Sequence, residues 1–252
     1  MPEIANPPRP WVINVGKRLR PLVDSAIARS SRVPNDPLLD PALFPFAEEL
    51  RAKWRVIRDE AAAVAARPDE VPPLDRISPD HRGIAPAGKW RSFFLYGYGY
   101  PAVANIARCP ETAAIVERIP GLNSAFFSIL KPNTHIPDHR GVTKGLVTCH
   151  LGLKVPRSGD CRMRVHDQIV YWREGEPLFF DDTYHHEVWN ESEELRVILL
   201  IQIRRPARFP GNLIGGLFLW GVRRTPFVQE GRANVAKWDA GVRELEKAGN
   251  EP

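Results

Sequence analysis

The chain has 252 residues, a formal net charge of +5 at pH 7 and a sequence pI of about 9.3. Its hydrophobic fraction of 43% is ordinary for a globular protein, and its charged fraction of 26% argues against a disordered chain. The length fits one large β domain with helical additions. The basic balance is compatible with an anionic partner such as a phosphate, a carboxylate co-substrate or an acidic membrane surface, and it does not select among these.

The cysteines and the N-terminal residues bear on where the protein is found. Cys109, Cys149 and Cys161 include no C-x-x-C pair, and their odd number argues against a disulfide framework. Residues 1–8 lack a basic stretch followed by an apolar core, so we expect no signal peptide. The longest apolar run, residues 213–222, is about half the length that a membrane-spanning helix needs. We therefore expect a soluble protein of the cytoplasm.

The first third of the chain, residues 1–89, is predicted to be an arm and a helix that pack on the main domain. Residues 1–35 mix proline, arginine and serine and are expected to form the arm. Residues 46–66 are predicted to be helical, and 67–88, rich in proline and aspartate, a loop. The helix is predicted from apolar residues at helical spacing, namely Leu50, Trp54, Ile57 and Ala61.

Residues 90–206 are predicted to form a β-rich domain. The aromatic, glycine-punctuated run 93–100 indicates a strand that leads into a turn, and a short helix with Pro110 in its first turn is expected from Cys109 to about Arg118. Further strands are predicted at 125–130, 146–153, 162–170, 178–180, 187–189 and 195–203. Many short strands without intervening helices indicate a mainly β fold of the sandwich or jelly-roll type.

Residues 207–252 are predicted to hold an apolar segment and a final helix. Thr225 and Pro226 are typical of a helix start, as N-cap and first helical residue. Its apolar stripe is expected at Val228, Val235, Trp238, Val242 and Leu245. The run 213–220, followed by Arg223 and Arg224, places an apolar segment beside cations, as in helices that lie at a membrane surface. Packing of this run in the core is the alternative.

Histidines concentrate in the β-rich region. His135, His139, His150, His166, His185 and His186 all fall within it. Neutral imidazole is a common protein ligand of iron, zinc and copper, and histidines on several strands of one barrel can converge on its interior. A surface position or a hydrogen-bonded core position is the alternative for each of them taken singly.

Four motifs in order give this region a family resemblance. They are Phe-Ser-Ile-Leu-Lys-Pro-Asn-Thr-His-Ile-Pro-Asp-His-Arg-Gly at 127–141, Cys-His-Leu-Gly-Leu-Lys-Val-Pro at 149–156, Phe-Asp-Asp-Thr-Tyr-His-His-Glu-Val-Trp-Asn at 180–190 and Arg-Val-Ile-Leu-Leu at 196–200. Together they resemble the aspartyl/asparaginyl β-hydroxylase family, whose members are 2-oxoglutarate oxygenases with a double-stranded β-helix. Residues 88–99 and 224–227 are most similar to its branch of bacterial lipid A acyl-chain hydroxylases.

The resemblance implies that His139 and His186 ligate Fe(II). On a strand, His185 and His186 would face opposite ways, so at most one of them can face the interior, and the motif selects His186. The position two residues after His139, where related oxygenases carry a carboxylate ligand, is Gly141. The family is known for lacking that carboxylate, and Asp138 or Asp182 as a replacement ligand is the alternative.

The co-substrate 2-oxoglutarate is a dianion, and its burial requires a paired positive charge. Arg196 is the candidate because it is a lone cation in an apolar strand, and its planar fork can donate two hydrogen bonds to a carboxylate. The resemblance implies help from Ser128 and a contact from His150. Thr148 stands where the family usually has a further arginine. Arg164 or Arg140 could supply that missing charge.

These residues predict a dioxygenase that uses Fe(II), 2-oxoglutarate and O₂ to hydroxylate an unactivated carbon. A lipid acyl chain and an Asp- or Asn-type side chain are the two predicted substrate classes, with contact at the inner-membrane surface for the former. A non-catalytic metal- or ligand-binding β-barrel is the alternative from another class, favoured by the change at Thr148. Nucleic-acid binding is not expected, because the basic residues are dispersed and match no nucleic-acid-binding motif.

Overall fold

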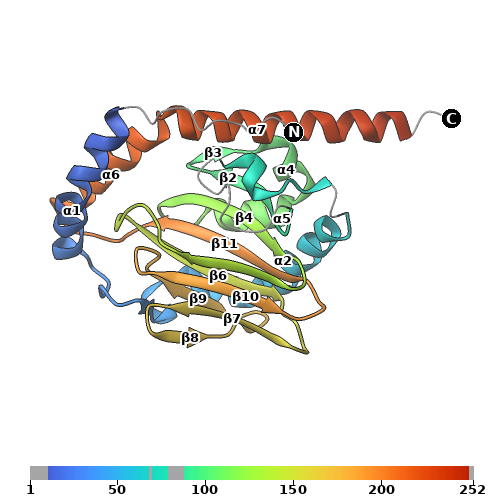
Figure 1. Cartoon of the computed structure of the whole chain (residues 1–252), viewed down its shortest axis with the longest axis horizontal. Coiled ribbons are helices and arrows are strands. Elements are labelled where there is room, and N and C mark those ends of the chain that lie inside the picture. The colour runs from blue at the N-terminus through green and yellow to red at the C-terminus, as the bar shows by residue number, and fades with distance from the viewer. Residues whose placement is uncertain (1–10, 68–69, 79–87, 250–252) are drawn as a thin grey trace.

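Two antiparallel sheets that face each other form the centre of the molecule (Figure 1). The computed structural model describes residues 11–67, 70–78 and 88–249. The larger sheet has the strand order β1-β9-β6-β11-β4-β2-β3, and the smaller has the order β5-β10-β7-β8. The strands are β1 (Leu38–Leu39), β2 (Trp90–Gly97), β3 (Tyr100–Pro101), β4 (Leu122–Leu130), β5 (Thr134–His139), β6 (Leu146–Lys154), β7 (Asp160–Val165), β8 (Gln168–Val170), β9 (Pro177–Phe180), β10 (His186–Glu191) and β11 (Arg196–Arg204).

Helices from the N-terminal and C-terminal parts of the chain flank the sheets. They are α1 (Trp11–Ser30), η1 (Pro41–Leu43), α2 (Phe46–Ala65), α3 (Leu74–Ile77), α4 (Val103–Arg108), α5 (Pro110–Glu117), α6 (Gly211–Arg223) and α7 (Pro226–Gly249). Figure 1 shows α1 and α6 side by side at one edge of the barrel, with α7 crossing over it. The predicted double-stranded β-helix with flanking helices is therefore confirmed.

The burial of each strand follows from the layers around it. Strands β4, β6 and β11 are buried along almost their whole length, because the larger sheet is covered by α2 and α5 on one face and by the smaller sheet on the other. Strand β7 alternates instead, with Cys161, Met163 and Val165 inside and Arg162 and Arg164 outside. The smaller sheet therefore has one inner face and one solvent face.

Sequence patterns predicted the position of most helices and strands, but one prediction merged two strands and some elements were not predicted. The predicted helix at 46–66 and the helix after Cys109 agree with α2 and α5 to within a residue or two. The predicted strand 162–170 is two strands, since His166 has a positive φ of 56° and turns the chain between β7 and β8. Helices α1 and α6 and strand β5 were not predicted, and the expected loop at 67–88 includes the one-turn helix α3.

Some of the expectations fall where nothing is described. Residues 1–10 of the expected arm, 68–69 and 79–87 of the expected loop, and the side chains of Val242 and Leu245 lie outside the described part of the structure. Within the described part, no helix combines the length and apolar character that crossing a membrane requires.

Candidate active site

Strand pairing brings the two predicted iron ligands together. His139 ends β5 and His186 begins β10, and the antiparallel register places them directly opposite each other. Their ring centroids lie 4.2 Å apart. His139 Nδ1 is 2.8 Å from the carbonyl oxygen of Pro137, and His186 Nδ1 is 2.9 Å from that of Tyr184. Since a carbonyl oxygen only accepts, each Nδ1 carries the proton and each Nε2 keeps a free lone pair.

Burial keeps both rings uncharged. It lowers the pKa of His139, and it lowers the pKa of His186 to about 4, with the neighbouring His139 as the next cause. A carbonyl partner on Nδ1, a neutral ring and an open Nε2 are the features of a metal-binding histidine. The pair is therefore suited to hold one metal ion between two strands.

A carboxylate has no room at the third position. A Cβ built on Gly141 would overlap the carboxylate of Asp182, so no side chain fits there. Asp182 Oδ2 accepts hydrogen bonds from Thr148 (3.1 Å) and Gln202 (3.2 Å), and Asp182 Oδ1 is buried with no hydrogen-bond partner among the described residues. Burial and the adjacent Asp181 raise the pKa of Asp182 to about 7.

Asp138 faces away from the histidine pair. Its carboxylate is 2.5 Å from His185 Nδ1 and accepts a hydrogen bond from Arg164 at 2.9 Å, on the outer face of the smaller sheet. His185 is exposed while His186 is buried, as predicted from strand alternation together with the motif. Among the residues that the structure describes, no three or more histidine, cysteine, aspartate and glutamate side chains are grouped to hold a metal. A site here thus rests on two protein ligands.

Arg196 is a buried cation, and no anion pairs with it among the residues that the structure describes. It begins β11, is 2% exposed, and its guanidinium carbon lies 4.9 Å from the ring centre of Trp172. Its Nε is buried and has no hydrogen-bond partner among the described residues. Burial lowers the pKa of Arg196 to about 10, which leaves it charged at neutral pH. Because an unpaired buried charge is costly, this geometry indicates a site for an anion.

Ser128 and His150 flank this cation. Ser128, on β4, accepts a hydrogen bond from Trp90 Nε1 at 2.9 Å. His150 Nδ1 accepts one from Trp172 Nε1 at 3.3 Å, and burial, Arg196 and His186 lower the pKa of His150 well below its usual value. The two tryptophans were not singled out from the sequence. Their neighbours in sequence carry no signal for this role.

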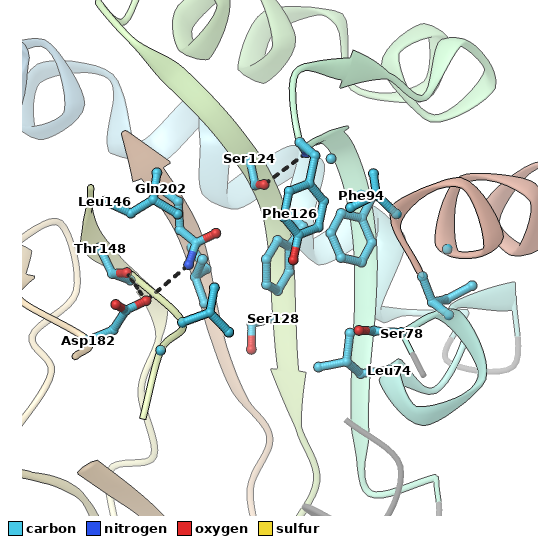
Figure 2. Close-up of a pocket in the computed structure, with 18 of the residues that line it drawn as sticks. Leu74, Ser78, Phe94, Ser124, Phe126, Ser128, Leu146, Thr148, Asp182 and Gln202 are labelled. Atoms are coloured by element: carbon cyan, nitrogen blue, oxygen red, sulfur yellow. Dashed lines mark hydrogen bonds between the residues drawn. The ribbon is translucent and has the colours of Figure 1, made fainter. Parts of the chain in front are cut away.

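All six predicted site residues line one cavity of about 1030 Å³. They are Ser128, His139, Thr148, His150, His186 and Arg196. Figure 2 shows Thr148, Asp182 and Gln202 on one side of the cavity and the phenyl rings of Phe94 and Phe126 on the other, with Ser128 between. Those two rings stack at 4.4 Å. The cavity therefore has a polar wall and an apolar wall.

The missing arginine at Thr148 has two possible substitutes on the cavity wall. Arg140 lines the cavity, as expected of one candidate. Arg164 does not, because it lies on the outer face of β7 and pairs with Glu187 and Asp138. Arg20 of α1, which sequence reasoning missed, also lines the cavity and donates to the carbonyl oxygen of Gly141 at 2.6 Å.

The apolar wall extends into the helices. Beyond Phe94 and Phe126 it is formed by α3, α4, α6 and α7. Its apolar side chains include Leu74, Ile77, Phe218, Leu219, Val222, Phe227 and Val228. None of these was predicted as a site residue, because helical periodicity alone cannot distinguish a core stripe from a cavity wall.

A buried ion network holds the turn before His186. Asp181 is fully buried and accepts from the backbone N–H (3.0 Å) and hydroxyl (2.6 Å) of Thr183. Its other oxygen pairs with Arg205 and with Lys144 Nζ at 2.7 Å. The turn at 181–184 is thereby tied to the residue that follows β11 and to the loop after β5.

The fold and this site define the class of the protein: a double-stranded β-helix with a two-histidine site beside a buried arginine. Residues 51–206, more than half of the chain, match the family model for Aspartyl/Asparaginyl beta-hydroxylase. The chain belongs to this hydroxylase family.

Two relatives narrow the comparison. An ornithine lipid ester-linked acyl 2-hydroxylase of Rhizobium tropici is 38% identical over 217 residues, which cover 86% of this chain and 77% of that protein. The human aspartyl/asparaginyl beta-hydroxylase is 30% identical over 168 residues, or 65% of this chain and 21% of the human protein. A solved Pseudomonas putida prolyl-4-hydroxylase covers 61% of this chain and 88% of its own at 18% identity and a TM-score of 0.39, and the family assignment does not depend on it.

Proposed function

We propose that this protein is an Fe(II)- and 2-oxoglutarate-dependent dioxygenase that hydroxylates an acyl chain of a lipid. The observation that carries the proposal is the single cavity that joins the histidine pair and Arg196 to an apolar wall. The acyl 2-hydroxylase of Rhizobium tropici, similar over most of both chains, supports the same substrate class. The inner surface of the cytoplasmic membrane is then the place where the substrate is met.

The donor set fits the metal and the co-substrate. The free Nε2 atoms of His139 and His186 would hold Fe(II), which oxygenases commonly bind through two imidazoles and one carboxylate with further positions open. Gly141 leaves the carboxylate position open as well. Arg196, whose Nε lacks an acceptor, would donate to one carboxylate of 2-oxoglutarate, with Ser128 and His150 at its sides. When bound, iron with 2-oxoglutarate and O₂ supplies the oxidising power that an unactivated C–H bond requires.

The protein's own groups bind and orient the metal and the co-substrate, and they exclude water. Trp172 covers Arg196 and donates to His150, so this end of the cavity is closed by aromatic rings. The carbonyl partners of the two histidines fix their tautomers and ring orientation. Thr148 donates to Asp182 and brings no positive charge, so the second carboxylate of the co-substrate depends on Arg140 or Arg20.

The apolar wall favours the acyl substrate. The cavity of about 1030 Å³ lies at the upper end of the range of about 300–1,000 Å³ that is common for cavities with drug-sized ligands. Because 2-oxoglutarate is smaller than such ligands, the cavity has room for a substrate beside it. Burying hydrocarbon in it is favourable by roughly 25 cal/mol per Å² of apolar area removed from water. An Asp- or Asn-type side chain is the second candidate, favoured by the cations Arg20 and Arg140 on the polar wall.

Anaerobic titration followed by product analysis tests the proposal. Fe(II) and 2-oxoglutarate together should produce a metal-to-ligand charge-transfer absorption band. On admission of O₂, mass spectrometry should find one added oxygen in a diacyl or acyl-amino-acid lipid, together with succinate. Oxygen added only to Asp or Asn compounds would favour the second substrate class. Absence of both the band and succinate would leave the non-catalytic ligand-binding barrel.

A further inference from the structure

Helix α6 is apolar on two opposite faces. Its inner face holds Gly211, Gly215 and Leu219, all buried, and Ile27 of α1 packs 3.5 Å from the position of a Cβ on Gly215. Its outer face carries three large exposed side chains, Leu213 (52% exposed), Leu217 (60%) and Trp220 (56%). A surface helix of a globular protein normally has polar residues on its outer face. This outer face is therefore unlike an ordinary solvent face.

The exposed side chains form one continuous stripe. Leu213, Leu217 and Trp220 follow the i, i+4, i+7 spacing, which places them along one side of the helix. Phe209, 76% exposed, precedes the helix by two residues. We call these four residues the α6 apolar face. Apolar side chains gathered in this way mark a contact surface, whereas single exposed ones do not.

The charge around this face is positive. From Arg204 to Gln229 the chain has no acidic residue and five arginines, of which Arg205 is buried against Asp181. Arg208 and Arg224 are exposed, and the Arg224 guanidinium carbon lies 3.8 Å from the ring centre of Trp220. Helix α1, which runs beside α6 (Figure 1), adds Arg29, and Arg20, which pairs with Asp24, the one acid among the side chains of α1 that the structure describes. An apolar stripe flanked by arginines suits the surface of an anionic bilayer.

The α6 apolar face adjoins the cavity. Leu217 belongs to both, and the next two residues, Phe218 and Leu219, line the cavity from the inner side of the helix. Thirteen residues of helix measure about 20 Å, less than the ~30 Å of a bilayer core, so α6 would lie in the interface plane. We propose that the α6 apolar face docks on an anionic bilayer, so that an acyl chain enters the cavity past Leu217 without crossing water. This proposal rests on the acyl-chain substrate proposed above.

Vesicle binding tests it without any turnover. The test variant is Leu213→Glu with Trp220→Glu, two exposed residues outside the cavity. The matched control is Ile169→Glu with Tyr171→Glu, equally exposed residues at and just after β8, on the far side of the barrel in Figure 1. In sedimentation with phosphatidylglycerol-containing vesicles, the test variant should bind at least about tenfold more weakly and the control as the natural chain. Pure phosphatidylcholine should bind weakly, and Arg224→Gln should cost about fivefold.

Further measurements separate docking from catalysis and from dimerisation. His186→Ala should bind vesicles like the natural chain, so that loss of hydroxylation and loss of docking are separable. Leu213→Glu with Trp220→Glu should hydroxylate a detergent-dispersed lipid at the natural rate and a vesicle-embedded one at least about tenfold more slowly. Equal vesicle binding by test and control variants would overturn the proposal. The proposal would also be overturned if the natural chain is a dimer and the test variant is a monomer, since the face would then bind a second copy.

Discussion

The two ends of the cavity are built by different kinds of structure. At one end, paired strands hold His139, His186 and Arg196 at positions that the backbone register sets. At the other end, helices α6 and α7 supply apolar side chains and few polar atoms. Chemistry on a metal needs ligands held within a fraction of an ångström, which a sheet provides, whereas a hydrocarbon chain needs only apolar area of the right shape. We therefore expect substitutions at the strand end to affect the reaction and substitutions at the helical end to affect the choice of substrate.

The largest effect is expected at the strand end. His186→Ala removes one of the two proposed iron ligands, so Fe(II) binding and hydroxylation should fall more than about 100-fold. The control is His185→Ala, the adjacent exposed residue, which loses only a surface contact to Asp138 and should change activity by less than about fivefold. Iron titration followed by charge-transfer absorbance measures both. Similar losses in the two variants would remove the assignment of His186.

The second prediction concerns the buried cation. Arg196→Leu should weaken 2-oxoglutarate binding by about 10- to 150-fold, because one charge-assisted hydrogen bond is worth roughly 1.5–3 kcal/mol. The melting temperature without co-substrate should hold or rise, since a buried charge without a partner is removed. Calorimetric titration and thermal unfolding separate the two quantities. Arg164→Leu, on the outer face of β7, is the control and should leave co-substrate affinity unchanged.

The helical end should alter substrate choice and leave the iron chemistry intact. Val222→Trp places a large ring in the apolar part of the cavity, so activity on long acyl chains should drop about tenfold while short chains are spared. Val56→Trp, on α2 and outside the cavity, is the control. Rates on a series of chain lengths provide the measurement. If the rate falls equally for all chain lengths, or if the charge-transfer band is lost, the two ends of the cavity do not act separately.

The smallest effect is a pH dependence of stability at the polar wall. The pKa of Asp182 is about 7 in the folded protein against an ordinary 3.8, so between these values the folded state holds a proton that the unfolded chain releases. The free energy of unfolding therefore falls as pH rises through this interval. Asp182→Asn should remove this contribution and flatten the fall in melting temperature by a few degrees. An unchanged slope would mean that Asp182 is ionised when folded.

Patterns local in the sequence were enough for most of the strands, the helices α2 and α5, and the motif residues, although β5 was missed and β7 and β8 were joined. Alternation implied that at most one of His185 and His186 faces inward, and the motif selected His186, which is buried while His185 is exposed. The ordered motifs likewise singled out Arg196, which is buried in the same cavity as the histidines. In each case the deciding information lies within a few residues of the position itself.

Other features depend on contacts between distant segments, and no local pattern could supply them. Arg164 and Arg196 both lie in strands, yet one faces water and one the cavity, because only the packing of one sheet on the other creates an inside. Thr148 meets Asp182, and Arg20 meets Gly141, across more than thirty and more than a hundred residues of chain respectively. The sequence of α6 suited a core and a membrane surface equally, and folding buried one face of the helix and left the other exposed.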